Sequence, residues 1–286
     1  MSDNPKHIIH NGEIVFADVP QLFANNRGFC YGDGVFETMH AYGTEIQFAD
    51  AHFERLYKGL KTLKIEINES ISQQKIIREI VRLLNIEKLF GGVRIRMAIY
   101  RDSDGLFTPK QNAPSFTITC SPLESGHYEL NHKGLSVEIF KEISKPINCF
   151  SSFKTANSLM NTMAGIWAKE HGFDDCLIIN DRGQIIESFH SNLFIVKDNV
   201  IYSPALILGC IDGVMRTQIL KIAREIGFST NDNIQITESD LLGADEIFLT
   251  NAIEGIRWIG AFRQRRYFNK IAKQLCEHLN KNIFAS

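Results

Sequence analysis

One lysine in the middle of the chain lies in a setting that suits covalent chemistry. Lys154 is flanked by Phe153 and Thr155, and no other basic residue occurs between Lys145 and Lys169. Partial desolvation lowers the pKa of an ammonium group, and the neutral amine can attack a carbonyl carbon to form a Schiff base. An isolated lysine near the start of a helix is also common, so this residue alone leaves a structural role open.

Three glycines precede a predicted strand near the N-terminus. Gly28, Gly32 and Gly34 lie within seven residues and lead into a strand predicted at residues 35–42. Such glycines allow the backbone to pass close to another group. The order differs from the dinucleotide-binding fingerprint, which runs from a strand into a helix. A tight turn without a ligand is the alternative.

An arginine on the first predicted helix could bind a phosphate. Arg55 follows His52 by three residues on the helix predicted at residues 49–63, so both side chains project from one face. A guanidinium group can hold a phosphate through two parallel hydrogen bonds. A surface arginine would show the same spacing.

A second candidate for anion binding is a helix start in the C-terminal half. The segment GCIDGVMR, residues 209–216, leads from a loop into a helix predicted at residues 213–226. The first turn of a helix leaves backbone N–H groups free, and the helix dipole favours an anion there. This start could therefore bind a phosphate, although a helix start without a ligand is the commoner case.

Glu187 ends a strand predicted at residues 184–187, directly after two isoleucines. A buried carboxylate is costly without a cationic partner, and a pyridinium nitrogen would be one. A solvated strand end is the alternative. Together, a lysine that can form a Schiff base, a carboxylate, an arginine and a helix start are the groups that pyridoxal phosphate requires.

The elements that must position these groups follow from the apolar patterns. Alternating segments predict strands, and apolar stripes at helical spacing predict helices. The predicted helices cover residues 49–63, 71–84, 158–171, 213–226 and 267–280. The predicted strands cover residues 35–42, 93–100, 115–120, 135–143, 175–179, 184–187, 192–196, 199–203 and 247–250, after a hairpin at residues 8–15.

Strands outnumber the crossover helices, so a mixed α+β fold with two domains fits better than a doubly wound parallel sheet. We expect a small N-terminal α/β domain at residues 1–121 and a larger C-terminal domain at residues 135–286. The polar segment at residues 122–134 contains proline and glycine and is the expected linker.

Composition excludes several classes of function. The chain has 286 residues, 44% of them apolar, and a formal net charge of -2, which argues against nucleic acid as a main partner. The basic run at residues 263–266 is interpreted as a solvated helix face. No signal peptide or transmembrane segment is predicted. The spacing of the cysteines and histidines predicts neither disulfides nor a metal site, so we expect a reduced, cytoplasmic protein.

The chain as a whole resembles the class IV, or fold type IV, pyridoxal-phosphate enzymes. These are branched-chain aminotransferases, D-amino acid aminotransferases and 4-amino-4-deoxychorismate lyases. The resemblance rests on ordered segments: YGDGVFET at residues 31–38, HxxRL at residues 52–56, KT at residues 154–155, ExxxxNLF at residues 187–194, GVMR at residues 213–216 and EIFLTNA at residues 246–252.

This resemblance implies a role for each matching residue. Lys154 is similar to the lysine that carries the cofactor and moves protons, and Glu187 is similar to the partner of the ring nitrogen. The residues similar to the phosphate site are Arg55, Val214, Met215, Asn251 and Ala252. Ile211 is expected to pack against the ring. The resemblance also implies a C-terminal pseudo-barrel and a homodimer, with the active site near the interface.

The reaction depends on the residues that face the substrate. Arg96 resembles an arginine with which branched-chain aminotransferases place the substrate carboxylate, and Tyr31 and Phe36 resemble residues that line the pocket. We therefore favour an aminotransferase that uses a branched-chain or similar small apolar amino acid and a 2-oxo acid. Thr38 departs from the branched-chain pattern, so a lyase that releases pyruvate and 4-aminobenzoate is the alternative. A D-amino acid aminotransferase is a weaker third option.

Overall fold

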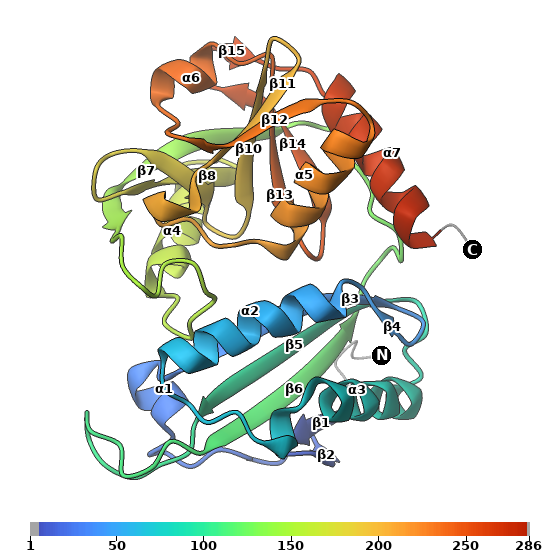
Figure 1. Ribbon diagram of the computed structural model, residues 1–286, viewed down its shortest axis with the longest axis vertical. Helices are drawn as coiled ribbons and strands as arrows, with labels where there is room; N and C mark the ends of the chain where they lie inside the picture. Colours follow the sequence, from blue (N-terminus) through green and yellow to red (C-terminus); the bar gives the residue numbers. More distant parts are fainter. Residues whose placement is uncertain (1–5, 285–286) are drawn as a thin grey trace. The chain divides into compact units, whose positions relative to one another are not determined.

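The computed structural model describes residues 6–284, which divide into two compact units (Figure 1). Unit 1 contains residues 6–126 and the short segment Phe153–Asn157. Unit 2 contains His127–Ser152 and residues 158–284. The chain therefore leaves unit 2 for only five residues, and those residues include Lys154. The domain limits 1–121, 122–134 and 135–286 stay a prediction.

Unit 1 is built on an antiparallel six-stranded sheet in the order β2-β1-β6-β5-β3-β4. The long central strands alternate buried apolar residues with polar ones, as expected for a sheet with one covered face. The strands are β1 (His7–His10), β2 (Glu13–Phe16), β3 (Gly34–Tyr42), β4 (Glu45–Ile46), β5 (Gly92–Arg101) and β6 (Pro114–Pro122).

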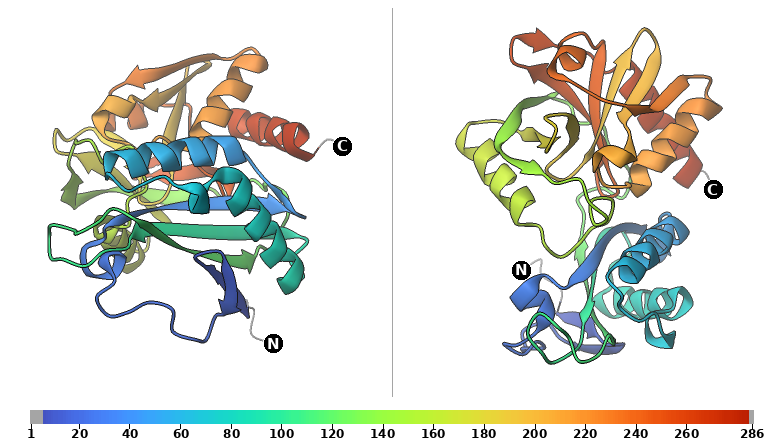
Figure 2. Two further views of the ribbon diagram at one scale, coloured as in Figure 1. Left: turned by 60° about the horizontal axis from the view of Figure 1, so that its bottom comes forward. Right: turned by 60° about the vertical axis from the view of Figure 1, so that its left-hand side comes forward.

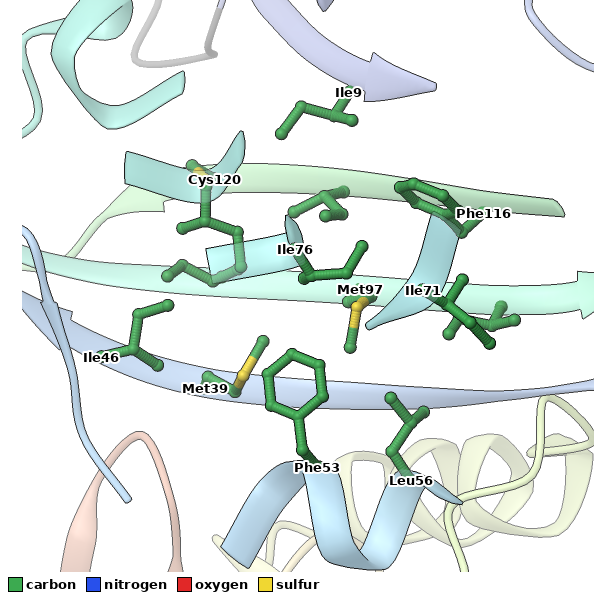
Figure 3. Packing of buried hydrophobic residues seen from close by; sticks show 14 of the residues in the cluster. Ile9, Met39, Ile46, Phe53, Leu56, Ile71, Ile76, Met97, Phe116 and Cys120 are labelled. Atoms are coloured by element: carbon green, nitrogen blue, oxygen red, sulfur yellow. The ribbon is translucent and has the colours of Figure 1, made fainter. Parts of the chain in front are cut away.

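Two helices cover one face of this sheet (Figure 2). Helix α2 (Ala49–Thr62) buries Phe53, Leu56 and Leu60, and α3 (Gln73–Glu87) buries residues at the same helical spacing. Figure 3 shows Phe53 and Leu56 pointing toward the side chains of β3 and β5, including Met39 and Met97. Phe36, Thr38, Arg94 and Arg96 alternate with these core residues and so lie on the opposite face of the sheet.

Unit 2 contains a nine-stranded mixed sheet, part of which closes on itself. The strand order is β12-β11-β10-β13-β14-β7-β8-β9, and β9 also pairs with β10, which closes a six-stranded barrel. The barrel strands are β7 (Leu135–Lys145), β8 (Asp175–Asn180), β9 (Ile185–Ser188), β10 (Asn192–Lys197), β13 (Glu246–Asn251) and β14 (Gly255–Phe262). The predicted α+β architecture with a barrel-like sheet is confirmed.

The remaining elements of unit 2 are β11 (Val200–Pro204), β12 (Ser229–Ile234), β15 (Arg265–Arg266), α4 (Leu159–Glu170), α5 (Val214–Glu225), α6 (Glu238–Leu242) and α7 (Lys270–Phe284). Two expectations were wrong. The basic run at residues 263–266 forms the turn from β14 into β15 and not a helix face. The Gly-rich segment contains the short helix α1 (Arg27–Tyr31), whose N-terminus is capped by the Asn26 side chain.

Candidate active site

Lys154 is held beside β3 by backbone pairing. The Phe36 N–H donates to the Lys154 carbonyl at 2.8 Å, and the Ala156 N–H donates to the Gly34 carbonyl at 2.9 Å. Val35 and Thr155 are therefore opposite each other, so Lys154 shares a face with Phe36. The Lys154 Nζ lies 5.3 Å from the centroid of the Phe36 ring, and the lysine is half-buried.

The glycine before this strand has a steric role. A Cβ atom at Gly34 would lie 2.4 Å from the carbonyl oxygen of Ile99 on β5. Only glycine therefore allows β3 to pair with β5 while its other edge accepts the Lys154 segment. This explains one glycine of the predicted close backbone approach.

Two arginines lie on the same face as Lys154. The Arg96 guanidinium stacks 4.1 Å over the Phe36 ring, and Arg94 is two residues away on the same strand. Within residues 6–284, neither arginine forms an ion pair or a hydrogen bond with its side chain. Partial desolvation, with a contribution from the charge of Arg94, lowers the pKa of Arg96. This face is thus suited to a carboxylate.

Arg55 is part of a buried ion pair. Its Nε and Nη2 donate to the two oxygens of Glu37 at 2.8 and 2.6 Å, and His52 Nδ1 donates to Glu37 Oε2 at 2.8 Å. Burial alone would raise the pKa of Glu37, but the charge of Arg55 and the hydrogen bonds lower it to about 2. Burial lowers the pKa of His52, against the opposing effect of Glu37. Glu37 therefore fixes the guanidinium group of Arg55.

Glu187 has two partners in unit 2. Its side chain is 3% exposed, and its Oε1 accepts a hydrogen bond from Lys145 Nζ at 2.5 Å. Its Oε2 accepts one from the Ile211 backbone N–H at 2.7 Å. The sequence predicted that this carboxylate needs a cation, and the structure provides Lys145. Each oxygen retains a second lone pair for a further donor.

The start of α5 forms an anion-binding geometry. Gly213 is the N-cap residue, and the N–H groups of Val214 and Met215 lie in the first turn, where no carbonyl precedes them within the helix. A Cβ atom at Gly213 would lie 1.8 Å from Asn192 Oδ1, so a larger residue here would displace the Asn192 side chain. Asn192 pairs with Thr250 across β10 and β13, which places the two side chains side by side.

Thr250 adds an unused hydroxyl to this site. Its residue is 1% exposed, and its Oγ1 has no hydrogen-bond partner within the part of the chain that the structure describes. A buried hydroxyl of this kind can donate a hydrogen bond to a ligand or to a water molecule. The free N–H groups, the glycine and the hydroxyl therefore fit a phosphate group.

The turn after β13 is stabilised by the side chain of Asn251. Its Oδ1 accepts from the Ile253 and Glu254 N–H groups at 2.9 and 2.8 Å, and its Nδ2 donates to Ser191 Oγ at 3.0 Å. The Ala252 carbonyl accepts from Tyr128. Only the backbone N–H groups of this segment are thus candidates for contact with a ligand.

Comparison with known proteins decides the family. Residues 34–262 match the Amino-transferase class IV family. The aminodeoxychorismate lyase of Bacillus subtilis is 30% identical over 249 residues, which are 85% of this chain and 82% of that protein. The branched-chain-amino-acid aminotransferase of Pseudomonas aeruginosa is 27% identical over 291 residues, which cover 96% and 92% of the two chains. The chain belongs to the class IV aminotransferases.

The fold is that of the same family. The crystal structure of the branched-chain amino acid aminotransferase from Thermobaculum terrenum in its PLP-form has a TM-score of 0.85 at 19% identity. It matches 99% of this chain, and the match covers 95% of that protein. No helix within residues 6–284 is long and apolar enough to span a membrane.

The predicted class IV residues divide between the units. Unit 1 contains Lys154, Arg55, Tyr31, Phe36 and Arg96, and unit 2 contains Glu187, Ile211, Val214, Met215, Asn251 and Ala252. Sequence reasoning missed three residues that contact or extend this set, namely Glu37, Lys145 and Thr250. Glu37 and Thr250 stand inside the quoted segments, whereas nothing along the chain relates Lys145 to Glu187, 42 residues away.

Proposed function

We propose that this class IV enzyme is a pyridoxal-phosphate-dependent aminotransferase. It would transfer an amino group between a branched-chain or similar small apolar amino acid and a 2-oxo acid. The observation that carries this proposal is the placement of Lys154, which is half-buried and shares the Phe36 ring with Arg96. An amine next to a carboxylate-binding cation is the arrangement that an amino acid substrate requires.

The cofactor would be held by the residues that match the class IV motifs. Glu187 would bind the protonated ring nitrogen, and Ile211 would pack against the ring. The phosphate would be bound by Arg55, by the N–H groups of Val214, Met215, Asn251 and Ala252, and by the Thr250 hydroxyl. When bound, the protonated ring withdraws electrons from the carbon that loses its proton.

Hydrogen bonds within unit 2 connect Glu187 with the segment that precedes Lys154 in the sequence. Ile211 donates its N–H to Glu187, and the next residue, Asp212, donates its N–H to the Ser152 carbonyl at 3.0 Å. Ser152 precedes Lys154 by two residues. In the proposed reaction, Lys154 binds the cofactor aldehyde and later moves the Cα proton of the substrate.

The substrate would be recognised by Arg96, with Phe36 and Tyr31 lining the pocket. The stacking of Arg96 on Phe36 fixes the guanidinium group, so little side-chain entropy is lost when it binds a carboxylate. Aromatic side chains would at the same time offer apolar surface to an aliphatic side chain.

One observation favours the lyase alternative. Thr38 is directly opposite Arg96 in the pairing of β3 with β5, so its hydroxyl lies on the face that would bind substrate. A larger polar substrate such as aminodeoxychorismate could use this hydroxyl. The relative at 30% identity is also named as a lyase.

One preparation assayed on two substrates separates the activities. The proposal predicts that leucine and 2-oxoglutarate yield glutamate, and that aminodeoxychorismate yields little pyruvate. Rapid release of pyruvate without glutamate formation would establish the lyase instead. Absence of both products and of cofactor uptake would reject the proposed function as a whole.

We also propose that a second copy of the chain covers an apolar surface of unit 1. Phe29, Leu106 and Phe107 are 82%, 77% and 88% exposed, and the Tyr31 and Phe107 rings are in a tilted contact with centroids 5.6 Å apart. Arg27 donates to the carbonyls of residues 105 and 106 and so holds this loop against α1. Exposed apolar groups of this size are typical of interfaces. A homodimer is therefore proposed.

A further inference from the structure

Lys145, the last residue of β7, is buried against the carboxylate proposed to bind the cofactor ring. Its side chain is 13% exposed, and Glu187 is 3% exposed. The ammonium donates to Glu187 Oε1 at 2.5 Å and to the Ser151 carbonyl at 3.0 Å. Lysine is seldom buried to this extent without a fixed partner.

The charge of Lys145 offsets the cost of burying Glu187. A carboxylate with 3% exposure is costly to bury unless a cation lies beside it. The Ile211 N–H contacts only the other oxygen. Lys145 therefore supplies the charged partner of Glu187 and fixes the position of its Oε1. Both charges also act on the neighbouring Cys210. Burial is the largest cause of the raised pKa of its thiol; the charge of Glu187 raises this pKa further, and the charge of Lys145 lowers it.

The same ammonium fixes the loop that leads to Lys154. Ser151, whose carbonyl binds Lys145, donates its hydroxyl to the Pro146 carbonyl at 2.9 Å and is itself 6% exposed. The next residue, Ser152, accepts the Asp212 N–H. One cation thus connects the carboxylate at the end of β9 with the segment that precedes the reactive lysine.

We propose that Lys145 is a positioning residue, which holds Glu187 as a fixed anion for the cofactor ring nitrogen and anchors the loop before Lys154. This inference rests on the proposed cofactor role of Glu187. Lys145 itself would touch neither cofactor nor substrate, and it would act through Glu187.

A double-mutant cycle on cofactor affinity tests this role. We expect K145M to raise the equilibrium dissociation constant for pyridoxal phosphate about tenfold, because a charge-assisted hydrogen bond to Glu187 is lost. In the E187Q background, K145M should change the constant less than about threefold, because the charged partner is gone. K145R should stay within about threefold of wild type, since it keeps the charge.

Lys141 provides a matched control on the same strand. Its side chain is 62% exposed and lies 3.8 Å from Glu238, so K141M should leave the dissociation constant unchanged. The proposal would be overturned if K145M reduced the affinity for pyridoxal phosphate equally in the wild-type and E187Q backgrounds. Tighter binding by K145M would also overturn it, because Lys145 would then compete with the cofactor.

Two further results keep the test decisive. If K145M does not fold, the comparison moves to K145R, and a loss of more than about tenfold in this charge-conserving variant would contradict the proposed positioning through charge. If wild-type protein binds no pyridoxal phosphate, the proposed function fails. If the wild-type protein binds pyridoxal phosphate but the effects of K145M and E187Q are additive, the proposed role of Lys145 fails and the proposed function stands.

Discussion

At the scale of single residues, the site depends on cations whose surroundings differ. Lys154 and Arg96 share the ring of Phe36, whereas Arg55 and Lys145 are paired with buried carboxylates. A cation already neutralised by a buried carboxylate holds that carboxylate and its surroundings in place. A guanidinium group stacked on an aromatic ring, as in Arg96, can instead bind an anionic ligand. Arg96 is therefore the arginine proposed to bind the substrate carboxylate, whereas Arg55, proposed to contact the cofactor phosphate, is held in place by Glu37.

Arg96 is the residue for which this distinction makes a direct prediction. We expect R96Q to reduce kcat/KM for the amino acid substrate by about 10- to 100-fold, because a charge-assisted hydrogen bond to the carboxylate is lost. The loss should appear mainly in KM. Arg82 is 60% exposed on α3, and R82Q is the matched control that should retain wild-type kinetics. Unchanged kinetics of R96Q would remove Arg96 from substrate recognition.

At the scale of elements, Glu37 connects β3 with α2 through the Arg55 and His52 side chains. Because the pKa of Glu37 in the folded protein, about 2, is below its ordinary value of 4.5, the carboxylate contributes stability above pH 4.5. That contribution is lost as the pH falls from about 4.5 to 2. The connection between helix and sheet is therefore sensitive to acid.

A comparison of E37Q with wild type tests this connection. At pH 7 we expect E37Q to lower the free energy of unfolding by about 3 kcal/mol, because a buried ion pair is broken. The difference should shrink as the pH is lowered from about 4.5 to 2, measured by urea unfolding. E54Q is the control: it alters a 67% exposed carboxylate on α2, the helix that carries Arg55, and should change the free energy of unfolding by less than about 1 kcal/mol. A difference that is independent of pH would contradict the assigned pKa.

Most elements could be predicted because they have a strong periodic pattern. The alternation in β3, β5 and β6 and the apolar stripes of α2 and α3 are local signals, and these elements were placed within a few residues. Helix α1 was missed because five residues containing a glycine have little helical signal, and its stability comes from the Asn26 cap. Strand β12 was missed because its sequence, STNDNI, has no apolar alternation. The strand is defined by its pairing with β11.

The candidate site was predictable only in part, for a related reason. Lys154 and Glu187 were singled out because their types conflict with their local surroundings. The partners of Arg55 and Glu187 come from other strands, and they are determined by sheet register rather than by sequence distance. A single sequence does not carry that register.

At the scale of the whole molecule, closure of the barrel brings the unit 2 residues together. The pairing of β9 with β10 places Glu187 opposite Asn192, whose side chain contacts the loop before α5 and whose cross-strand neighbour is Thr250. The proposed partner of the ring nitrogen and the proposed phosphate site are therefore fixed by one sheet. Variation in substrate would be carried mainly by unit 1.

The proposed homodimer gives a prediction at this scale. F107E should convert the protein to a monomer in size-exclusion chromatography with light scattering, because a charge in the apolar surface cannot be buried without a partner. Phe268 is 81% exposed in unit 2, and F268E is the control that should leave the dimer intact. The assignment of this surface is wrong if wild type is monomeric or if F107E and wild type dimerise equally.

Lys154 is the residue proposed to bind the aldehyde of pyridoxal phosphate. Borohydride reduction of the protein incubated with the cofactor, followed by peptide mass analysis, tests it most directly. The account predicts a stable phosphopyridoxyl group on the peptide containing Lys154 and its loss in K154A. A modification found on another lysine, or on none, would contradict it.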